Sequence, residues 1–301
     1  MNWKGVMPAI TTCFDADLKV DAAFIAQHAR WMVESGCTAI IPLGSLGEGA
    51  TLDFDEKLQV IDACLRGVDK GAPVAPAISA LRTTDAVKLA KAAADRGCSG
   101  LMVLPPYVYK GDWREMKSHV AAVIRATPLP CMLYNNPISY GTDFLPEQIA
   151  ELAKEHENLR AVKESSADVR RITAIRALLG DRLQISAGVD DLILEAMGAG
   201  AVGWVAGLVN AMPRESVQLF DLVMHGEREK AFELYRWFLP LLRMDTVPKF
   251  VQLIKLVQQE LGKGSAQVRA PRYEVIGAEL EEARATIHHA LSARPALAAA
   301  H

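Results

Sequence analysis

The amino-acid sequence predicts an α/β fold, a (β/α)8 TIM barrel with an additional C-terminal helical layer. Three observations lead to it. Up to residue 206, eight short apolar runs alternate with amphipathic helical patterns. Their spacing is typical of parallel strands joined by crossover helices. After the eighth run only helical patterns follow. An open doubly wound sheet has a similar local pattern, but the count of eight favours a closed barrel.

Each expected strand is a short apolar run followed by a polar or glycine-containing turn. The expected strands are residues 5–11, 38–43, 73–78, 100–104, 130–134, 159–163, 183–187 and 201–206. The expected helices between them are residues 22–35, 55–68, 84–94, 113–126, 146–155, 169–179 and 190–197. Pro146 at the start of one helix, and Gly36 and Gly97 after the ends of two others, are typical residues at helix boundaries.

The chain divides at about residue 224. Residues 1–224 are expected to form the barrel domain, and residues 225–301 a helical layer packed on it. Four helical patterns follow the last strand, at residues 214–224, 228–242, 247–261 and 276–291. We expect the first of them to complete the barrel. The alanine-rich tail, residues 293–301, is expected to fray.

Composition narrows the class of protein. The chain has 301 residues, of which 50% are hydrophobic and 23% charged, and its net charge of -3 offers no general attraction for nucleic acid or an anionic membrane. It begins without a secretion signal, and no apolar stretch approaches a membrane span. The five cysteines form no CxxC pair, and the histidines make no HxH or HExxH spacing. We therefore expect a cytoplasmic protein with no metal.

The strand expected at residues 159–163 ends on a lysine. Alternation places Ala161 and Lys163 on one face of the strand and Val162 on the other. In a parallel sheet covered by helices, an interior ammonium is unfavourable unless it is paired or has lost its proton. Lys163 is thus a candidate amine nucleophile, although the same pattern fits a lysine at the solvated end of a strand.

Other unusual residues follow the neighbouring strands, whose carboxyl ends share one face of a barrel. Tyr134 lies one β/α unit before Lys163, and a phenol beside an amine suits proton transfer around a carbinolamine. It also fits a tyrosine at the edge of the core. The turn Gly44-Ser45-Leu46-Gly47-Glu48 could expose successive N–H groups that hold an anion, or be an ordinary turn. Aromatic residues gather at Pro105-Pro106-Tyr107-Val108-Tyr109.

Together these residues resemble the class I, Schiff-base pyruvate aldolases and lyases, which include dihydrodipicolinate synthase and N-acetylneuraminate lyase. The resemblance covers nearly the whole chain. It depends on GxxGE at residues 44–48, YNxP at residues 134–137 and the pair Lys163-Glu164, in that order. The segment Gly188-Val189-Asp190-Asp191 matches the family's segment after the seventh strand.

The resemblance implies a mechanism without metal or organic cofactor. Lys163 would condense with the ketone of a 2-oxo acid, Tyr134 would shuttle protons, and Ser45 would link Tyr134 to a proton relay. Ser45 and the Leu46 amide would also hold the substrate carboxylate. Members are commonly homotetramers, dimers of dimers that share tyrosines across an interface. The expected substrate-binding residues are Gly44, Leu46, Gly47, Tyr109, Asn136, Ser139, Tyr140, Gly188, Gly203 and Trp204.

The sequence departs from the synthase pattern at several positions. Ser139 stands where synthases carry an arginine that grips the aldehyde substrate's carboxylate, and a serine cannot form that bidentate clamp. Leu46 replaces a threonine, and Val108 aligns with the tyrosine contributed by a neighbouring subunit. Trp204 replaces a serine of sialic acid lyases, and its bulk should shorten the pocket.

These departures favour a lyase or dehydratase acting on a small 2-oxo acid. A 2-keto-3-deoxy sugar acid, 4-hydroxy-2-oxoglutarate or a related hydroxylated ring imine would fit. The alternative is 4-hydroxy-tetrahydrodipicolinate (dihydrodipicolinate) synthase, which condenses pyruvate with aspartate semialdehyde, with another residue replacing the arginine. A third reading is a barrel that binds a 2-oxo acid without catalysis. The presence of Lys163, Tyr134 and Ser45 favours an enzyme.

Overall fold

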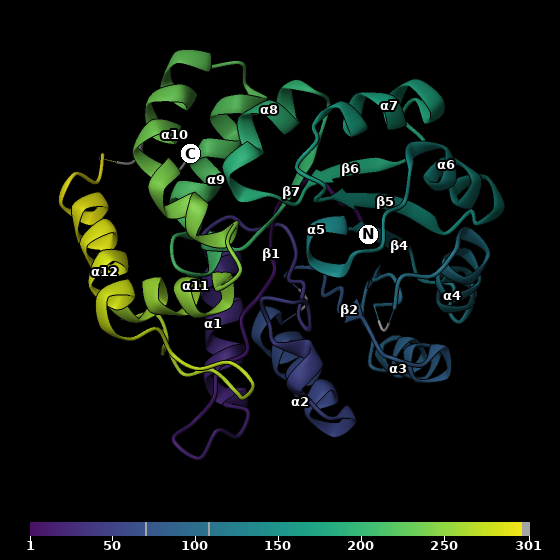
Figure 1. Cartoon of the computed structure of the whole chain (residues 1–301), viewed down its shortest axis with the longest axis horizontal. Helices are drawn as coiled ribbons and strands as arrows, with labels where there is room; N and C mark the ends of the chain where they lie inside the picture. Colours follow the sequence, from purple (N-terminus) through teal and green to yellow (C-terminus); the bar gives the residue numbers. More distant parts are fainter. Residues whose placement is uncertain (70, 108, 297–301) are drawn as a thin grey trace.

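A computed structural model of the chain describes residues 1–69, 71–107 and 109–296. Within these residues, parallel strands form one curved sheet surrounded by helices (Figure 1), in the order β1-β7-β6-β5-β4-β3-β2. The strands are β1 Gly5–Pro8, β2 Ala77–Ile78, β3 Leu101–Val103, β4 Cys131–Asn135, β5 Leu159–Glu164, β6 Gln184–Ala187 and β7 Gly203–Ala206.

The second expected strand, residues 38–43, closes the sheet between β1 and β2. Ile41 donates its N–H to the Pro8 carbonyl at 2.9 Å, and Ile40 donates its own to the Pro73 carbonyl at 2.9 Å. These contacts form isolated parallel bridges and not a continuous ladder, since Pro42 has no N–H to donate. Eight strand positions therefore complete the ring, and the predicted (β/α)8 barrel is confirmed.

Helices cover the outside of the ring close to the expected positions. They are α1 Ala22–Glu34, α2 Phe54–Val68, α3 Thr83–Asp95, α4 Trp113–Arg125, α6 Pro146–Glu155, α7 Arg170–Leu179 and α8 Ile193–Gly198. A 3-10 turn, Asp190–Leu192, precedes α8 where a continuous helix was expected. A short helix that the periodicity did not predict, α5 Pro137–Tyr140, follows β4.

The C-terminal helices gather on one side of the barrel, with α12 outermost (Figure 1). They are α9 Pro213–Met224, α10 Arg228–Leu242, α11 Phe250–Glu260 and α12 Gly277–Ser292. A 3-10 turn, Arg243–Asp245, separates α10 from α11. The boundary between barrel and layer at residue 224 stays a prediction. Part of the tail expected to fray, residues 297–301, lies outside the described residues.

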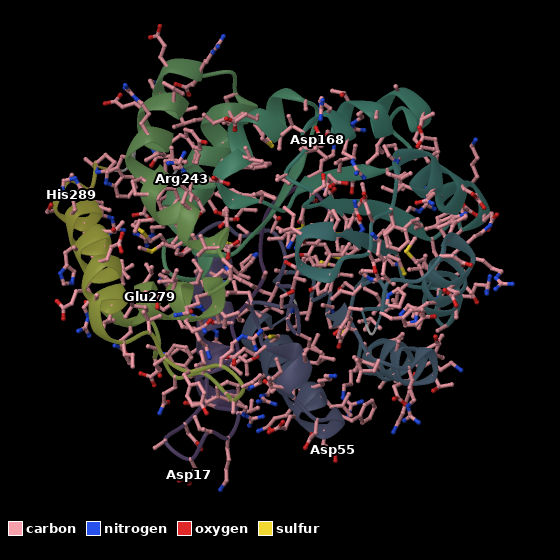
Figure 2. All side chains as sticks on the ribbon, viewed as in Figure 1. Asp17, Asp55, Asp168, Arg243, Glu279 and His289 are labelled. Atoms are coloured by element: carbon pink, nitrogen blue, oxygen red, sulfur yellow. The ribbon has the colours of Figure 1, made fainter. Side chains whose placement is uncertain are left out.

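The core is apolar on both faces of the sheet. Every residue of β4 and β7 is buried, as a parallel sheet covered by helices requires. All five cysteines are free and buried. None of the helices in the described part of the chain is long and apolar enough to cross a membrane. Figure 2 shows charged side chains spread over the periphery, including those of Asp17, Asp55, Asp168, Arg243, Glu279 and His289.

Candidate active site

Strands β4 and β5 bring an amine and a phenol together. Tyr134 and Lys163 are register partners on these two neighbouring strands. The Lys163 Nζ lies 4.3 Å from the centroid of the Tyr134 ring. Only 6% of Lys163 and 5% of Tyr134 is exposed. The two side chains that the sequence singles out thus meet near the carboxyl ends of the strands, where barrel enzymes carry their chemistry.

Gly188, which follows β6, leaves space for the lysine. A Cβ atom built on Gly188 would lie 2.6 Å from Lys163 Cε and 1.9 Å from Ser165 Oγ. The lysine side chain therefore runs directly over the Gly188 backbone, and any larger residue would displace it. The Ser165 Oγ is buried with no hydrogen-bond partner. This close approach gives Gly188 a physical role in placing the amine.

Asn136 connects the tyrosine of β4 to the short helix α5. Its Nδ2 donates a hydrogen bond to the Tyr134 hydroxyl at 2.9 Å. Its Oδ1 accepts the N–H of Ser139 at 3.0 Å, which makes Asn136 the N-cap of α5. Asn followed by Pro137 is a recognised helix start, so this signal could have predicted α5 from the sequence.

Helix α5 places a second tyrosine in the site. The Tyr140 hydroxyl is hydrogen-bonded to Ser45 Oγ, and its ring meets that of Tyr134 edge to face with centroids 5.8 Å apart. On its other side lies Tyr107, with centroids 5.9 Å apart. In the structure Ser45 is therefore joined to Tyr140, whereas the hydroxyl of Tyr134 is joined to Asn136.

Residues of the C-terminal layer hold the turn at residues 44–48, which follows the second strand position. Glu48 in this turn is buried, and its carboxylate contacts the Lys255 Nζ of α11 at 2.6 Å. The same carboxylate accepts the backbone N–H of Arg269 at 3.0 Å. Leu46 is buried, and Gly47 lies so close to Ile10 that a Cβ atom would meet its carbonyl oxygen at 2.7 Å. The turn is thus rigidly positioned beside the barrel mouth.

Comparison with known proteins shows the family to which the chain belongs. Residues 2–290 match the profile of the Dihydrodipicolinate synthetase family. The chain belongs to this family. It is 31% identical to the 4-hydroxy-tetrahydrodipicolinate synthase of Geobacter metallireducens over 89% of this chain and 92% of the relative. Identity to the synthase of Geotalea uraniireducens is 33%, with the same shares covered. Membership of the family makes the chain a lyase or synthase.

A solved structure supports the same assignment. A putative dihydrodipicolinate synthetase from Pseudomonas aeruginosa superimposes with a TM-score of 0.91 at 32% identity, covering 96% of this chain and all of the other. The tetramer expected of family members is a separate question, because the structure contains one chain. It stays a prediction.

Two positions expected to contact the substrate are more exposed than the buried cluster. Ser139, on α5, is exposed. Tyr109 is 58% exposed, and hydrogen bonding to Glu115 raises the pKa of its phenol. Within one chain Tyr109 therefore lies apart from Lys163. Val108, the position aligned with the neighbour's tyrosine, lies outside the described residues.

A buried aspartate accepts hydrogen bonds from residues at and after the end of β7. The fully buried Trp204 donates its indole N–H to Asp190 Oδ1 at 2.9 Å. Asp190 also accepts the N–H groups of Gly207 and Leu208. Burial raises the pKa of Asp190 to about 6, although these hydrogen bonds oppose the shift. Gly203 packs closely on the Trp3 carbonyl oxygen, which a Cβ atom would meet at 2.5 Å.

A second buried carboxyl comes from the C-terminal layer, and sequence reasoning missed it. A Cβ atom on Gly207 would lie 2.0 Å from Asp245 Oδ1, and this oxygen is buried with no hydrogen-bond partner. Burial and the nearby charge of Asp190 raise the pKa of Asp245 well above its usual value, while Lys163 opposes the shift. No local pattern marks Asp245, because it lies far from the strand ends in sequence.

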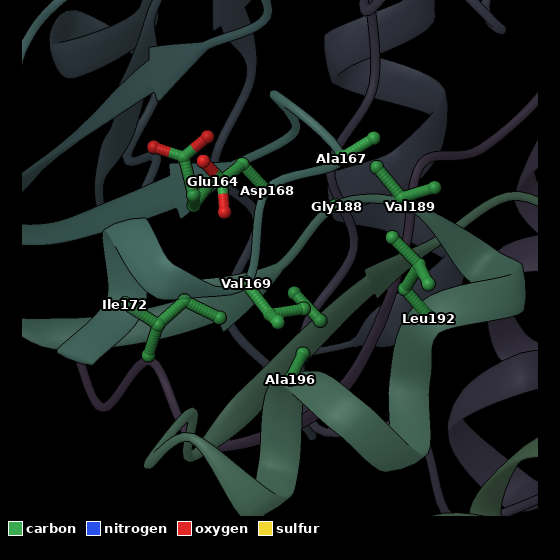
Figure 3. Close-up of a pocket in the computed structure, with 10 residues that line it drawn as sticks. Glu164, Ala167, Asp168, Val169, Ile172, Gly188, Val189, Leu192 and Ala196 are labelled. Carbon is green, nitrogen blue, oxygen red and sulfur yellow. The ribbon is translucent and has the colours of Figure 1, made fainter.

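A small pocket lies behind the ends of β5 and β6 (Figure 3), with Glu164 and Asp168 at one end and Val189 and Leu192 at the other. Lys163 does not line it. Burial raises the pKa of Glu164, while hydrogen bonds from Ser166 and Asn135 oppose the shift. This carboxyl therefore stabilises the strand ends, because it accepts hydrogen bonds from Asn135, opposite it on β4, and from the Ser166 N–H just after β5.

Proposed function

We propose that Lys163 condenses with the ketone of a small 2-oxo acid and that the chain is a Schiff-base lyase. The observation that carries the proposal is the position of the Lys163 amine over the Tyr134 ring, at 4.3 Å on the neighbouring strand. A nearly buried amine beside a phenol has the two groups that imine formation needs, a nucleophile and a proton carrier. Family membership supports the same chemistry.

The proposed step begins with neutral Lys163. Its nitrogen bonds to the ketone carbon, and one N–H proton passes to the former carbonyl oxygen, which gives a carbinolamine. A second proton then reaches that oxygen, the C–O bond breaks, water leaves, and the nitrogen lone pair forms a protonated imine. The positive imine draws electrons from the adjacent carbon and so assists C–C or C–X cleavage. Tyr134 is placed to carry the protons.

Two classes of substrate are candidates for this site. The exposed Ser139 supports a small 2-oxo acid, such as a 2-keto-3-deoxy sugar acid, 4-hydroxy-2-oxoglutarate or a hydroxylated ring imine, because a serine cannot form the bidentate clamp that grips the carboxylate of aspartate semialdehyde. The names of the curated relatives favour 4-hydroxy-tetrahydrodipicolinate synthase, the condensation of pyruvate with aspartate semialdehyde. On the comparisons alone, the synthase is the better supported of the two.

A panel of turnover assays separates these candidates. Purified protein is incubated with each small 2-oxo acid while pyruvate and other products are measured, and separately with pyruvate and aspartate semialdehyde coupled to a reductase. Turnover that disappears in Lys163→Ala and survives in Lys154→Ala, a change on the outer helix α6, identifies the reaction. Binding without turnover of any compound would support the non-catalytic reading and contradict the proposal.

A further inference from the structure

The hydroxyl bonded to Ser45 belongs to the same chain. In the part of the chain that the structure describes, the side-chain partner of Ser45 is the phenol of Tyr140. The ring of Tyr140 also packs edge to face against the ring of Tyr134, with the two centroids 5.8 Å apart. Lys163 in turn lies over the other tyrosine. One chain therefore contains an unbroken series of contacts from Ser45 through two phenols to the amine.

The position of Tyr140 is fixed by several independent contacts. Asn136 caps α5 at one end. At the other end the Gly141 N–H donates to the Pro137 carbonyl at 2.9 Å, with Gly141 at a φ of 67°, a conformation that favours glycine. Thr142 then anchors the following residues through a hydrogen bond to the Pro106 carbonyl at 3.0 Å. The phenol is therefore held in place before any substrate arrives.

The surroundings of Tyr140 keep its proton on the oxygen. Burial raises the pKa of this phenol, and the nearby hydroxyl of Tyr134 raises it further. The hydrogen bond to Ser45 and the guanidinium of Arg272 act in the opposite direction and are smaller influences. A neutral phenol is both a donor and an acceptor, so Tyr140 can receive one proton as it passes on another.

We propose that Tyr140 supplies, within its own chain, the relay hydroxyl that works with Ser45 to reprotonate Tyr134. The inference rests on the Schiff-base function proposed above. Tyr134 gives its proton to the leaving oxygen of the carbinolamine, and the Ser45–Tyr140 pair replaces that proton. Tyr140 keeps part of its surface exposed and takes a proton from solvent in exchange. Each hydroxyl thus ends with the proton count it began with.

The contact between the pair and Tyr134 need not be tight before substrate binds. Catalytic hydrogen bonds are often long in the free enzyme and shorten in the complex. What the geometry supplies beforehand is the ordered pair itself and the ring contact that brings it beside Tyr134. In the family that this chain resembles, a neighbouring subunit supplies such a tyrosine. The inference predicts instead that a single chain is sufficient for the relay.

The first test compares two phenylalanine variants, with pyruvate as the probe. Tyr140→Phe removes the hydroxyl that Ser45 bonds, whereas Tyr107→Phe removes a hydroxyl from the same aromatic cluster. In Tyr140→Phe, the rate of imine formation, measured by borohydride quenching at timed intervals, should fall about a hundredfold. The pyruvate concentration at half-saturation should stay within about twofold, since ring packing is kept, and Tyr107→Phe should keep the wild-type rate.

A second test asks whether the relay works within one chain. Lys163→Ala and Tyr140→Phe chains carrying different tags are co-expressed, and mixed oligomers are purified. A relay within the chain predicts no recovery of imine formation in the mixture. Recovery to a substantial fraction of the wild-type rate would show that Tyr140 acts across subunits and would overturn the inference. If the chain is monomeric, the supporting result is that the wild-type monomer forms the imine about a hundredfold faster than the Tyr140→Phe monomer.

The results also separate this inference from the proposed function. Absence of a Lys163 adduct in the wild-type protein would overturn the Schiff-base function itself. Labelling of the wild type together with an unchanged rate in Tyr140→Phe would overturn only the relay. An equal loss of rate in Tyr107→Phe would assign the effect to packing of the aromatic cluster, and would likewise overturn it. Thermal unfolding of both variants verifies that each is folded.

Discussion

On the β4–β5 side of the barrel mouth, the reactive groups lie close together in sequence, whereas a second side is built from distant segments. Tyr134, Tyr140 and Lys163 all lie within one β/α unit and the strand that follows it. On the other side, Lys255 reaches Glu48 across 207 positions, and Asp245 packs against Gly207. The first side carries the proposed chemistry, and the second holds buried charges that brace the mouth.

This difference has an energetic meaning. The tyrosines and the lysine need only neighbouring strand ends to meet, so local register is sufficient. The Glu48–Lys255 pair is almost fully enclosed, and such a pair gains little stability overall but is strongly destabilising when one partner is removed. Variants on the first side should therefore affect rates, and variants on the second should affect stability.

The largest expected effect is on the chemistry side. Lys163→Ala removes the amine that forms the imine, and we expect exchange of the pyruvate methyl protons with D2O to fall by at least about 10³-fold, because no other group can replace the nucleophile. Proton NMR of pyruvate in D2O measures it. The melting temperature should change little. Exchange that continued at the wild-type rate would remove Lys163 from the mechanism.

Breaking the buried ion pair should instead affect folding. Lys255→Met leaves the Glu48 carboxylate enclosed without its cation, and the free energy of unfolding should fall by about 3–5 kcal/mol. Urea denaturation measures the change. Lys249→Met, which breaks a half-exposed pair with Glu279, should cost no more than about 1 kcal/mol.

The double variant Glu48→Gln/Lys255→Met sharpens this result. It removes both charges, so it should recover most of the stability that Lys255→Met loses. A double variant no more stable than the single one would show that the pair's packing, and not the unpaired carboxylate, determines the loss.

Asp245→Asn should change how stability depends on pH. Burial raises the pKa of Asp245 in the folded protein, so the folded state binds this proton more tightly than the unfolded state does. Its stabilising contribution is therefore complete below the ordinary carboxyl value of 3.8 and is lost as the pH rises through the raised value. Wild-type protein should lose stability relative to Asp245→Asn over that rise, as measured by urea denaturation across a pH series.

The exposed Asp95 provides the matched control for this experiment. It lies on the surface at the end of α3, and Asp95→Asn should leave the pH dependence of stability close to that of the wild type. A curve for Asp245→Asn that also runs parallel to the wild-type curve would mean that Asp245 ionises normally.

The smallest effect is expected for Asn136, which connects Tyr134 to the helix that carries Tyr140. Asn136→Ala removes the cap of α5 and the hydrogen bond to the Tyr134 hydroxyl. We expect a loss of about 1 kcal/mol in the free energy of unfolding, together with an imine-formation rate roughly tenfold slower. Asn136→Asp, which keeps the cap but not the donor, should restore the stability without restoring the rate. Restoration of both would show that Asn136 acts only on the helix.

Local sequence patterns predicted most of the barrel because strand and helix periodicities are local properties. They placed Lys163 and Tyr134 on adjacent strands for the same reason. Residues 38–43 form only bridges, since the proline in that run interrupts the ladder. The short helix α5 was missed although its start carries a capping asparagine and a proline.

The remaining features depend on tertiary contacts. The bond between Ser45 and Tyr140 joins residues 95 positions apart, and the partner of Glu48 is still more distant. Nothing near Asp245 or Lys255 in the sequence distinguishes them from surface charges of ordinary helices. Only the closed barrel and its C-terminal layer bring these groups to the mouth, so composition and periodicity could not identify them.

Reduction with borohydride in the presence of pyruvate, followed by peptide mass spectrometry, tests most directly whether Lys163 forms the imine. We expect one adduct per chain, on the peptide containing Lys163, and none on Lys255, a second lysine that is buried in the described part of the chain. Lys163→Ala should remain unlabelled. An adduct on a different lysine, or no adduct with pyruvate or any small 2-oxo acid, would contradict the assignment of Lys163 as the Schiff-base residue.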